Sequence, residues 1–276
     1  MKKTMLIVMA ALFGLGGMAQ ETEADTSYIH IGDMKLQVIE NNDSTSVEFE
    51  EESRIGDKDA LTYWSGIDLG VNMFVDADGN TSLSGDEEWL STNPAKSLHW
   101  SFNIFEQKIK LVKNHVGITT GLGLTYNSYG LDDNVRITNV NDSTAGFILD
   151  RNTPDSLGGF TAFTKNKLRA TYVRVPVLLE FNTSEDPDRT FHLAAGVIAG
   201  LKIGSINKVH FEEDGSKVRQ RTANDFNMNQ FMLDATVRLG YRDFTLFANY
   251  GLTPLFEDGK GPEVYPLTFG ISLVAG

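Results

Sequence analysis

Apolar residues occupy every second position in eight separate segments between residue 63 and the C-terminus. In one of them Val116, Ile118, Leu122 and Leu124 alternate with glycine and threonine. An alternation of period two is typical of a β-strand whose two faces meet different surroundings. The pattern therefore predicts an all-β chain. The segments are residues 67–73, 98–104, 116–126, 173–181, 191–203, 231–241, 244–250 and 267–273.

The polar face of these strands consists mainly of glycine, threonine, serine and asparagine. Glycine weakens a strand that faces water, whereas small side chains suit the narrow interior of an eight-stranded barrel. We therefore expect the polar face to line the interior and the apolar face to contact lipid. This predicts a transmembrane antiparallel up-and-down β-barrel of about eight strands. A soluble, lipocalin-like barrel with its apolar face inside is the alternative.

Six charged residues, three acidic and three basic, fall on the predicted luminal face. An isolated charge in so narrow a space is costly, so we expect these residues to pair and to close the lumen. The predicted luminal charge network consists of Asp68, Arg174, Glu180, Lys202, Asp234 and Arg238.

The connections between the strands alternate strictly between long and short. Outer-membrane barrels have long outer loops and short periplasmic turns, so the alternation predicts that both termini are periplasmic. The long connections are residues 76–96, 127–166, 204–228 and 253–264; the short ones are 105–115, 182–190 and 242–243.

The N-terminus has the pattern of a secretory signal. Lys2 and Lys3 precede an apolar run from Met5 to Met18, and a cut after Ala19 would leave small residues at the cleavage site. We expect a signal peptide at residues 1–19, an acidic periplasmic leader at 20–60 that forms a small hairpin or a loose tail, and a barrel domain at 61–276. No apolar run reaches the length of a transmembrane helix, and the formal net charge of −13 argues against nucleic acid as a partner.

Aromatic residues gather near the predicted strand ends, which suggests two girdles at the level of the lipid headgroups. Pro176 cannot donate a ladder hydrogen bond, and the apolar phase shifts nearby, so we expect a β-bulge at residues 172–176. The girdle residues at the short-turn end are Trp64, Phe181, Phe191, Tyr241 and Phe244; those at the long-loop end are Phe74, Trp100, Tyr126, Tyr129 and Tyr265.

Few residues suggest chemistry. Residues 76–82 with Glu87 partly match a calcium loop, but Thr81 stands where the loop needs glycine, so an acidic outer loop is the preferred interpretation. His99 and Ser101 share the luminal face and are interpreted as a hydrogen-bonded pair rather than a catalytic one. No histidine lies at metal-ligand spacing from another. We therefore predict no catalytic residue, no metal and no cofactor.

Two stretches carry a family resemblance: VPVLLEFN at residues 175–182 and YGLTPLF at residues 250–256. With these stretches, residues 60–276 resemble the outer-membrane β-barrel domain proteins of Bacteroidota, which include PorT-like barrels. The resemblance implies an outer-membrane location and supplies no common catalytic residue. The chain departs from many such barrels by ending in LVAG rather than in an aromatic residue.

The sequence thus predicts a non-enzymatic outer-membrane barrel. Its expected role is structural or interactive, with lipid around the barrel and an extracellular or envelope protein at loops 76–96, 127–166 and 204–228. The alternative is a transport or secretion-assisting barrel, which only the PorT-like resemblance suggests.

Overall fold

The computed structural model divides into two units, residues 1–55 and 56–276, which we describe separately. It describes residues 25–31, 34–41, 44–51, 61–135, 137, 139–141, 144–147, 163–213 and 215–274. The predicted signal peptide lies outside these residues.

The first unit contains a three-stranded antiparallel sheet in the order β1-β2-β3. Its strands are β1 (Asp25–Ile31), β2 (Met34–Asn41) and β3 (Ser44–Glu51). The sheet has one strand more than the hairpin expected for the leader. The third strand includes most of the acidic run, where Val47 and Phe49 alternate with polar residues, a pattern that favours extended structure.

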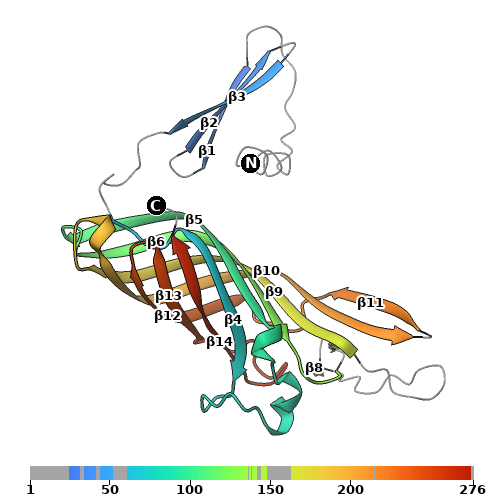
Figure 1. Cartoon of the computed structure of the whole chain (residues 1–276). Helices are drawn as coiled ribbons and strands as arrows, with labels where there is room; N and C mark the ends of the chain where they lie inside the picture. The colour runs from blue at the N-terminus through green and yellow to red at the C-terminus, as the bar shows by residue number, and fades with distance from the viewer. Residues whose placement is uncertain are drawn as a thin grey trace. The chain divides into compact units, whose positions relative to one another are not determined.

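The second unit is a barrel of eight antiparallel strands, which confirms the predicted fold class (Figure 1). Pairing of β14 with β4 and of β9 with β10 closes the ring, so every barrel strand has two neighbours. The ring consists of β4 (Gly66–Val75), β5 (Leu98–Val112), β6 (Val116–Gly130), β9 (Phe163–Asn182), β10 (Phe191–Glu213), β12 (Phe231–Tyr241), β13 (Phe244–Gly251) and β14 (Tyr265–Val274).

Shorter elements lie in the connections. They are the strands β7 (Asn139–Asn141), β8 (Thr144–Phe147) and β11 (Ser216–Ala223) and the 3-10 helices η1 (Gly85–Leu90), η2 (Pro94–Lys96) and η3 (Pro187–Arg189). We call the end of the barrel with the turns 113–115, 183–190 and 242–243 the turn end, and the opposite end the long-loop end.

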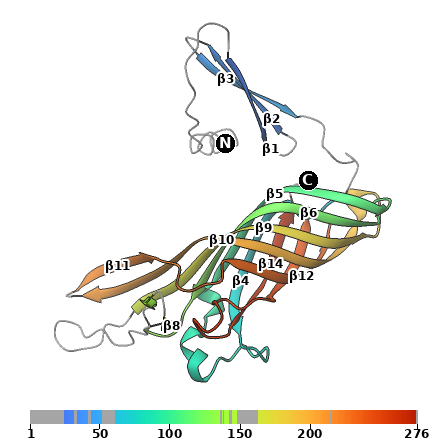
Figure 2. The same ribbon diagram turned by 180° about the vertical axis from the view of Figure 1, so that it is seen from behind.

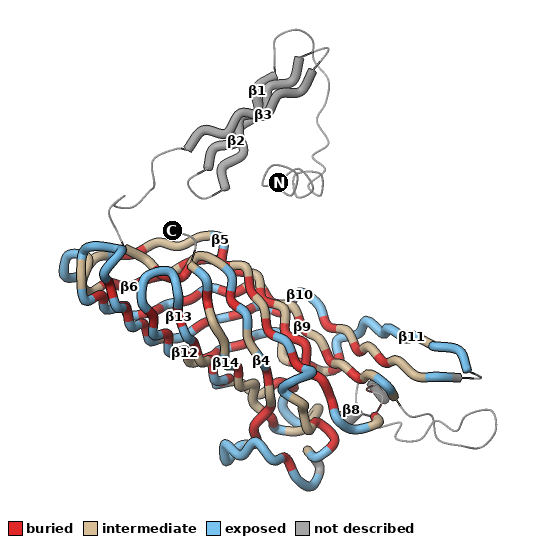
Figure 3. The backbone as a smooth tube through the Cα atoms, in the orientation of Figure 1, coloured by how far each residue is buried: buried red, intermediate tan, exposed pale blue. Residues whose placement is uncertain are grey.

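Burial alternates along the barrel strands, as the tube in Figure 3 shows. In β12 the inward residues Asp234, Thr236 and Arg238 are buried, whereas the outward Phe231 is 70% exposed and Leu239 is 54% exposed. The buried face is thus the polar one and the exposed face the apolar one. This arrangement is the reverse of the soluble, lipocalin-like alternative and fits a barrel surrounded by lipid. Within the described residues, no helix has the length and apolar character needed to cross a membrane.

The strands β9 and β10 are much longer than the sequence pattern predicts, with 20 and 23 residues. Their ends pair with each other and, on the far side of β10, with β11. Residues 163–169, 206–213 and 216–223 therefore form a three-stranded extension past the long-loop end, which we call the blade (Figure 2).

The predicted bulge at residues 172–176 is wrong. Side chains of β9 keep one phase from Leu168 to Asn182, with every even-numbered residue buried. The irregularity lies in β10, where the register against β9 shifts between Lys202 and Gly204. The apparent change of phase in the sequence arises because the inward residues at the long-loop end, such as Leu168 and Tyr172, are apolar themselves.

Candidate functional site: the barrel interior and the long-loop end

Three of the six predicted luminal charges meet near the centre of the barrel. A nitrogen of Arg174 lies 2.7 Å from one carboxylate oxygen of Asp68, and a nitrogen of Arg238 lies 3.0 Å from the other. Arg174 also donates to the side-chain oxygen of Asn103 at 3.0 Å. All three charged side chains are 1% exposed or less. Two guanidinium groups from β9 and β12 thus share one carboxylate from β4, which leaves an excess of one positive charge in this cluster.

Trp64 lies against the two arginines. The guanidinium carbon is 4.8 Å from the indole centroid for Arg174 and 5.1 Å for Arg238, which is the range of a cation–π contact. The indole also packs on Gly121, where a Cβ would come within 2.7 Å of the ring. Trp64 is completely buried, so its predicted place in the turn-end girdle is wrong. The segment that precedes β4 folds inward and places this ring inside the barrel.

The rest of the segment 61–65 is fastened at the turn end of the interior. The Glu106 carboxylate accepts hydrogen bonds from the backbone N–H of Trp64 at 2.8 Å and from that of Ser65 at 2.9 Å. The Tyr63 ring stacks on His192 with centroids 3.8 Å apart. These contacts fix the entry of the chain into β4 and hold Trp64 beside the arginines.

Glu180 pairs with a residue that the sequence pattern missed. Lys108 Nζ lies 2.8 Å from Glu180 Oε1, and Thr119 donates to the other oxygen at 2.9 Å. The sequence pattern did not place Lys108 in the interior because β5 is irregular: its register against β6 shifts between Asn103 and Phe105. Because a bulge inverts the alternation, residues beyond it point inward at even positions rather than odd ones.

The remaining two predicted charges do not join the central cluster. Lys202 binds the Asp225 carboxylate and the Met228 carbonyl, both from the connection that follows β11. Asp234 is 8% exposed, and its Oδ1 has no hydrogen-bond partner among the described residues. The six charges therefore separate into three groups: a cluster of three, two residues that pair with partners outside the predicted set, and one carboxylate, Asp234, without an ion pair in the described part of the chain.

The long-loop end contains a hydrophobic cluster drawn from strand ends and loops. Phe74 and Tyr129 stack with centroids 4.2 Å apart, and each is 1% exposed. Their predicted positions in the outer girdle are therefore wrong, because both face inward. The cluster comprises Phe74, Leu83, Trp89, Leu90, Tyr129, Leu131, Val135, Ile137, Leu168, Ala170, Tyr172, Phe226, Met228, Met232, Leu255, Phe256 and Val264.

The residues considered for chemistry are engaged in local hydrogen bonds. His99 contacts Asn127 Oδ1 at 2.7 Å and Ser101 Oγ at 3.2 Å, and Ser101 also contacts Thr125. This pair is buried in the interior. In the candidate calcium loop, Asp76 accepts hydrogen bonds from three N–H groups of its own loop, and the bonds to Asn80 lower its pKa. The described residues contain no group of three or more metal-ligating side chains.

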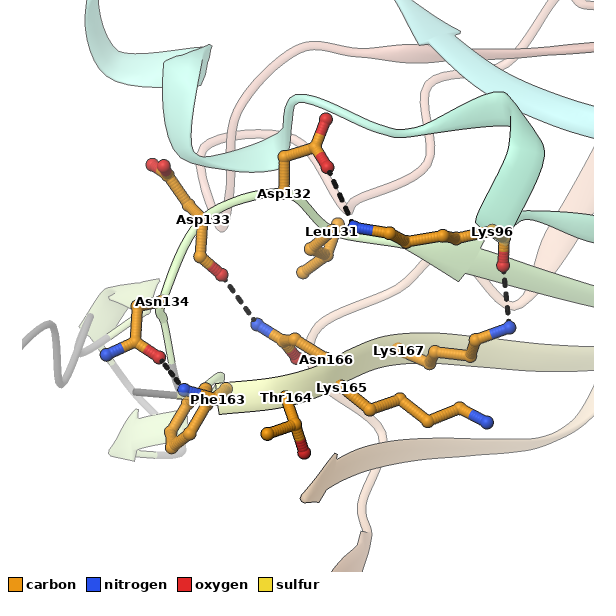
Figure 4. A pocket seen from close by; sticks show the side chains of 10 residues that line it. All are labelled: Lys96, Leu131, Asp132, Asp133, Asn134, Phe163, Thr164, Lys165, Asn166 and Lys167. Atoms are coloured by element: carbon orange, nitrogen blue, oxygen red, sulfur yellow. Dashed lines mark hydrogen bonds and ion pairs between the residues drawn. The ribbon is translucent and has the colours of Figure 1, made fainter. Parts of the chain in front are cut away.

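A cavity of about 350 Å³ lies beside the first residues of β9 (Figure 4). Lys167 Nζ donates to the Lys96 carbonyl at 2.6 Å, and Lys96 Nζ lies 3.6 Å from the Asp132 carboxylate. On the other side Asn166 donates to the Asp133 carbonyl at 3.1 Å. The cavity lies at the junction of the blade and the connection 131–134, and its lining carries both signs of charge.

The sequence and the structure were compared with those of known proteins. No curated protein matches the sequence. A solved structure, Ail, the attachment invasion locus protein of Yersinia pestis in complex with the heparin analogue sucrose octasulfate, aligns with 75% of this chain and 94% of its own, at 12% identity and a TM-score of 0.27. The family model "outer membrane protein beta-barrel domain" matches residues 62–257, which is most of the chain and includes seven of the eight barrel strands. The chain therefore belongs to the outer-membrane protein β-barrel domain family.

Proposed function

We propose that this outer-membrane barrel has a closed lumen and acts through the segments at its long-loop end. One observation carries the proposal: buried side chains fill the interior at three successive levels. Trp64 and the Asp68 cluster occupy the centre, Lys108 and Glu180 lie towards the turn end, and the hydrophobic cluster occupies the long-loop end. A barrel of eight strands has an interior of about the width that such side chains fill.

The orientation proposed is that the long-loop end faces the cell exterior and both termini are periplasmic. The lengths of the connections support it, because the described turns at the opposite end are short and outer-membrane barrels keep short turns in the periplasm. The segments available to an extracellular or envelope protein are then loops 76–96, 127–166 and 204–228, of which the second lies only partly within the described residues. An open lumen would instead favour the alternative, a PorT-like transport or secretion-assisting role.

Conductance distinguishes these two functions. Purified and refolded protein in a planar bilayer is expected to show no steady, porin-like current, because charged pairs and aromatic rings occupy the interior. A known porin inserted by the same procedure serves as the positive control for fusion. Steady ohmic conductance of the wild-type barrel would contradict the closed lumen and favour transport.

Surface labelling tests the orientation. An epitope tag inserted after Asp142, in the connection between β6 and β9, is expected to bind antibody on intact cells. A tag after Glu185, in the turn before β10, is expected to bind antibody only after the outer membrane is permeabilised. Both tagged barrels must first retain the gel shift on heating that marks a folded barrel. The opposite labelling pattern would reverse the proposed orientation.

A further inference from the structure

The outward side of the blade carries a concentration of positive charge, which we call the basic face: Lys165, Lys167, Arg169, Lys208, Arg219 and Arg221. The strand register brings these residues side by side. Lys167 lies opposite Lys208, which lies opposite Arg221. In the next row Lys165 lies opposite His210, which lies opposite Arg219. The six cations therefore occupy adjoining positions on one surface of three paired strands.

The charge is confined to this side of the blade. On the inward side of the same strands, Asn166, Leu168, Asn207 and Val209 are buried and uncharged. Among the described side chains of the outward side, Glu212, opposite Lys217, is the one acid. A surface this basic stands out in a chain whose formal net charge is −13.

No ion pair neutralises the basic face within the described part of the chain, so its cations repel one another. Partial desolvation together with Arg169 and Lys165 lowers the pKa of Lys208, a residue beyond the membrane-spanning part of β10. Desolvation and the same neighbours also lower the pKa of Lys167. Like charges held this close favour a bound anion, which relieves the repulsion.

The basic face begins where the lipid-facing surface ends. Outward residues of β9 from Phe181 to Val175 are large, apolar and more than a third exposed. In β10 the outward residues from Phe191 to Ile203 are all apolar and exposed, and they are large except for two alanines. A tilted strand crosses the hydrocarbon region in about ten residues. Counted from Phe181, eleven residues end at Thr171, and the next outward residue is Arg169. Arg169, followed by the row of Lys167, Lys208 and Arg221, therefore lies at the level of the lipid headgroups.

We propose that the basic face binds the phosphate groups of lipid headgroups that border the long-loop end of the barrel. Neighbouring strands are about 4.8 Å apart and outward residues of one strand about 6.6 Å apart, so one phosphate between two strands meets cations from both. The same strands present apolar side chains to the acyl chains of that lipid. This continuity favours a lipid over a soluble anionic polysaccharide. The inference does not depend on the orientation proposed above, because headgroups border that end in either case.

Native mass spectrometry of the detergent-solubilised full-length barrel tests the proposal. The probes are bisphosphorylated lipid A, the same lipid with both phosphates removed, inorganic phosphate and a carboxylated polysaccharide. The variants are K165Q/K208Q, R219Q/R221Q and the quadruple combination. R219Q/R221Q changes only β11, which lies outside the ring, so the barrel remains folded even if the blade is altered. The matched control is K113Q/R189Q, which removes two cations from exposed turns at the other end.

The expected result is retention of lipid A by the wild type and by K113Q/R189Q, with an affinity that falls by about tenfold or more in the quadruple variant. Each double variant should show a smaller loss. Removal of both phosphates from the lipid, or about 0.5 M NaCl, should weaken binding to the wild type but change the quadruple variant little. Equal binding of the two lipids, or equal binding by the wild type and the quadruple variant, would overturn the proposal. Tighter binding of the polysaccharide than of lipid A would assign the basic face to a soluble polyanion instead.

Discussion

Replacement of Asp68 by asparagine is expected to lower the free energy of unfolding of the barrel by about 3–5 kcal/mol. The carboxylate lies 2.7 Å from Arg174 and 3.0 Å from Arg238, and all three groups are buried. Asparagine preserves the shape of the side chain but removes the only negative charge of this cluster. Two guanidinium groups would then remain buried side by side without a counter-ion. Urea titration of the barrel folded into lipid vesicles, followed by tryptophan fluorescence, measures the loss.

An exposed ion pair provides the matched control. Asp188 lies 2.7 Å from Arg242 in the turns at the turn end, with side chains 75% and 51% exposed. Asp188→Asn makes the same chemical change and is expected to cost between 0 and about 1 kcal/mol, because water screens an exposed pair. If Asp68→Asn costs no more than this control, the buried cluster does not depend on charge compensation.

A double-mutant cycle measures the interaction energy between Asp68 and Arg174 apart from their other contacts. Arg174→Gln removes one of the two cations, so the Asp68→Asn/Arg174→Gln variant leaves one unpaired guanidinium where Asp68→Asn leaves two. The double variant is therefore expected to lose less stability than the sum of the two single variants, by about 1–3 kcal/mol. Additive losses would mean that Asp68 and Arg174 act independently despite their contact.

The alternation of apolar residues predicted the ring because a closed membrane barrel imposes one rule on every strand. Each strand has lipid on one side and a narrow interior on the other, so the two faces differ throughout its length. The alternation between apolar and polar residues no longer holds where the outward face of a strand does not contact hydrocarbon. In the blade, Lys and Arg replace most of the large apolar residues on the outward side, and the inward residues pack against loops. The regular alternation therefore began at Val173, ten residues after the observed start of β9 at Phe163, and the apolar residues just before it were interpreted as a bulge.

Local irregularities explain the partners that were missed in the interior. Phase counted from His99 and Ser101 places Lys108 outward, whereas the register shift after Asn103 turns it inward towards Glu180. Asp225 belongs to a connection, where no alternation exists to indicate its direction. When one partner of an ion pair follows a bulge or lies in a loop, the sequence pattern therefore predicts the other partner but not the pair.

The girdle prediction failed for a different reason. It used the position of aromatic residues along the strand and ignored the face on which they lie. Phe74 shares the phase of Asp68 and Asn72, and Tyr129 shares that of Thr125, so parity alone indicates that both rings point inward. Trp64 precedes β4 and has no strand phase, which is why only the structure reveals its place beside the arginines.

Trp64→Ala is expected to produce the second large loss of stability, about 3–5 kcal/mol. The indole is fully buried, packs on Gly121 and covers both guanidinium groups of the central cluster. Its removal leaves a cavity across the middle of the interior and exposes two cations to it. The same urea titration measures the loss, because the chain has two other tryptophans that report unfolding.

Trp100→Ala is the matched control, because Trp100 faces outward on β5 and contacts Tyr126 and Phe102 with ring centroids 5.2 and 5.1 Å apart. It leaves no internal cavity, so its expected cost is below about 2 kcal/mol. Trp64→Phe separates packing from electrostatics: phenylalanine keeps an aromatic face towards the arginines but fills less of the space. The free energy of unfolding of Trp64→Phe is expected to lie between those of the wild type and Trp64→Ala. If Trp64→Ala costs no more than Trp100→Ala, the indole does not support the central cluster, and the filled interior must depend on the ion pairs alone.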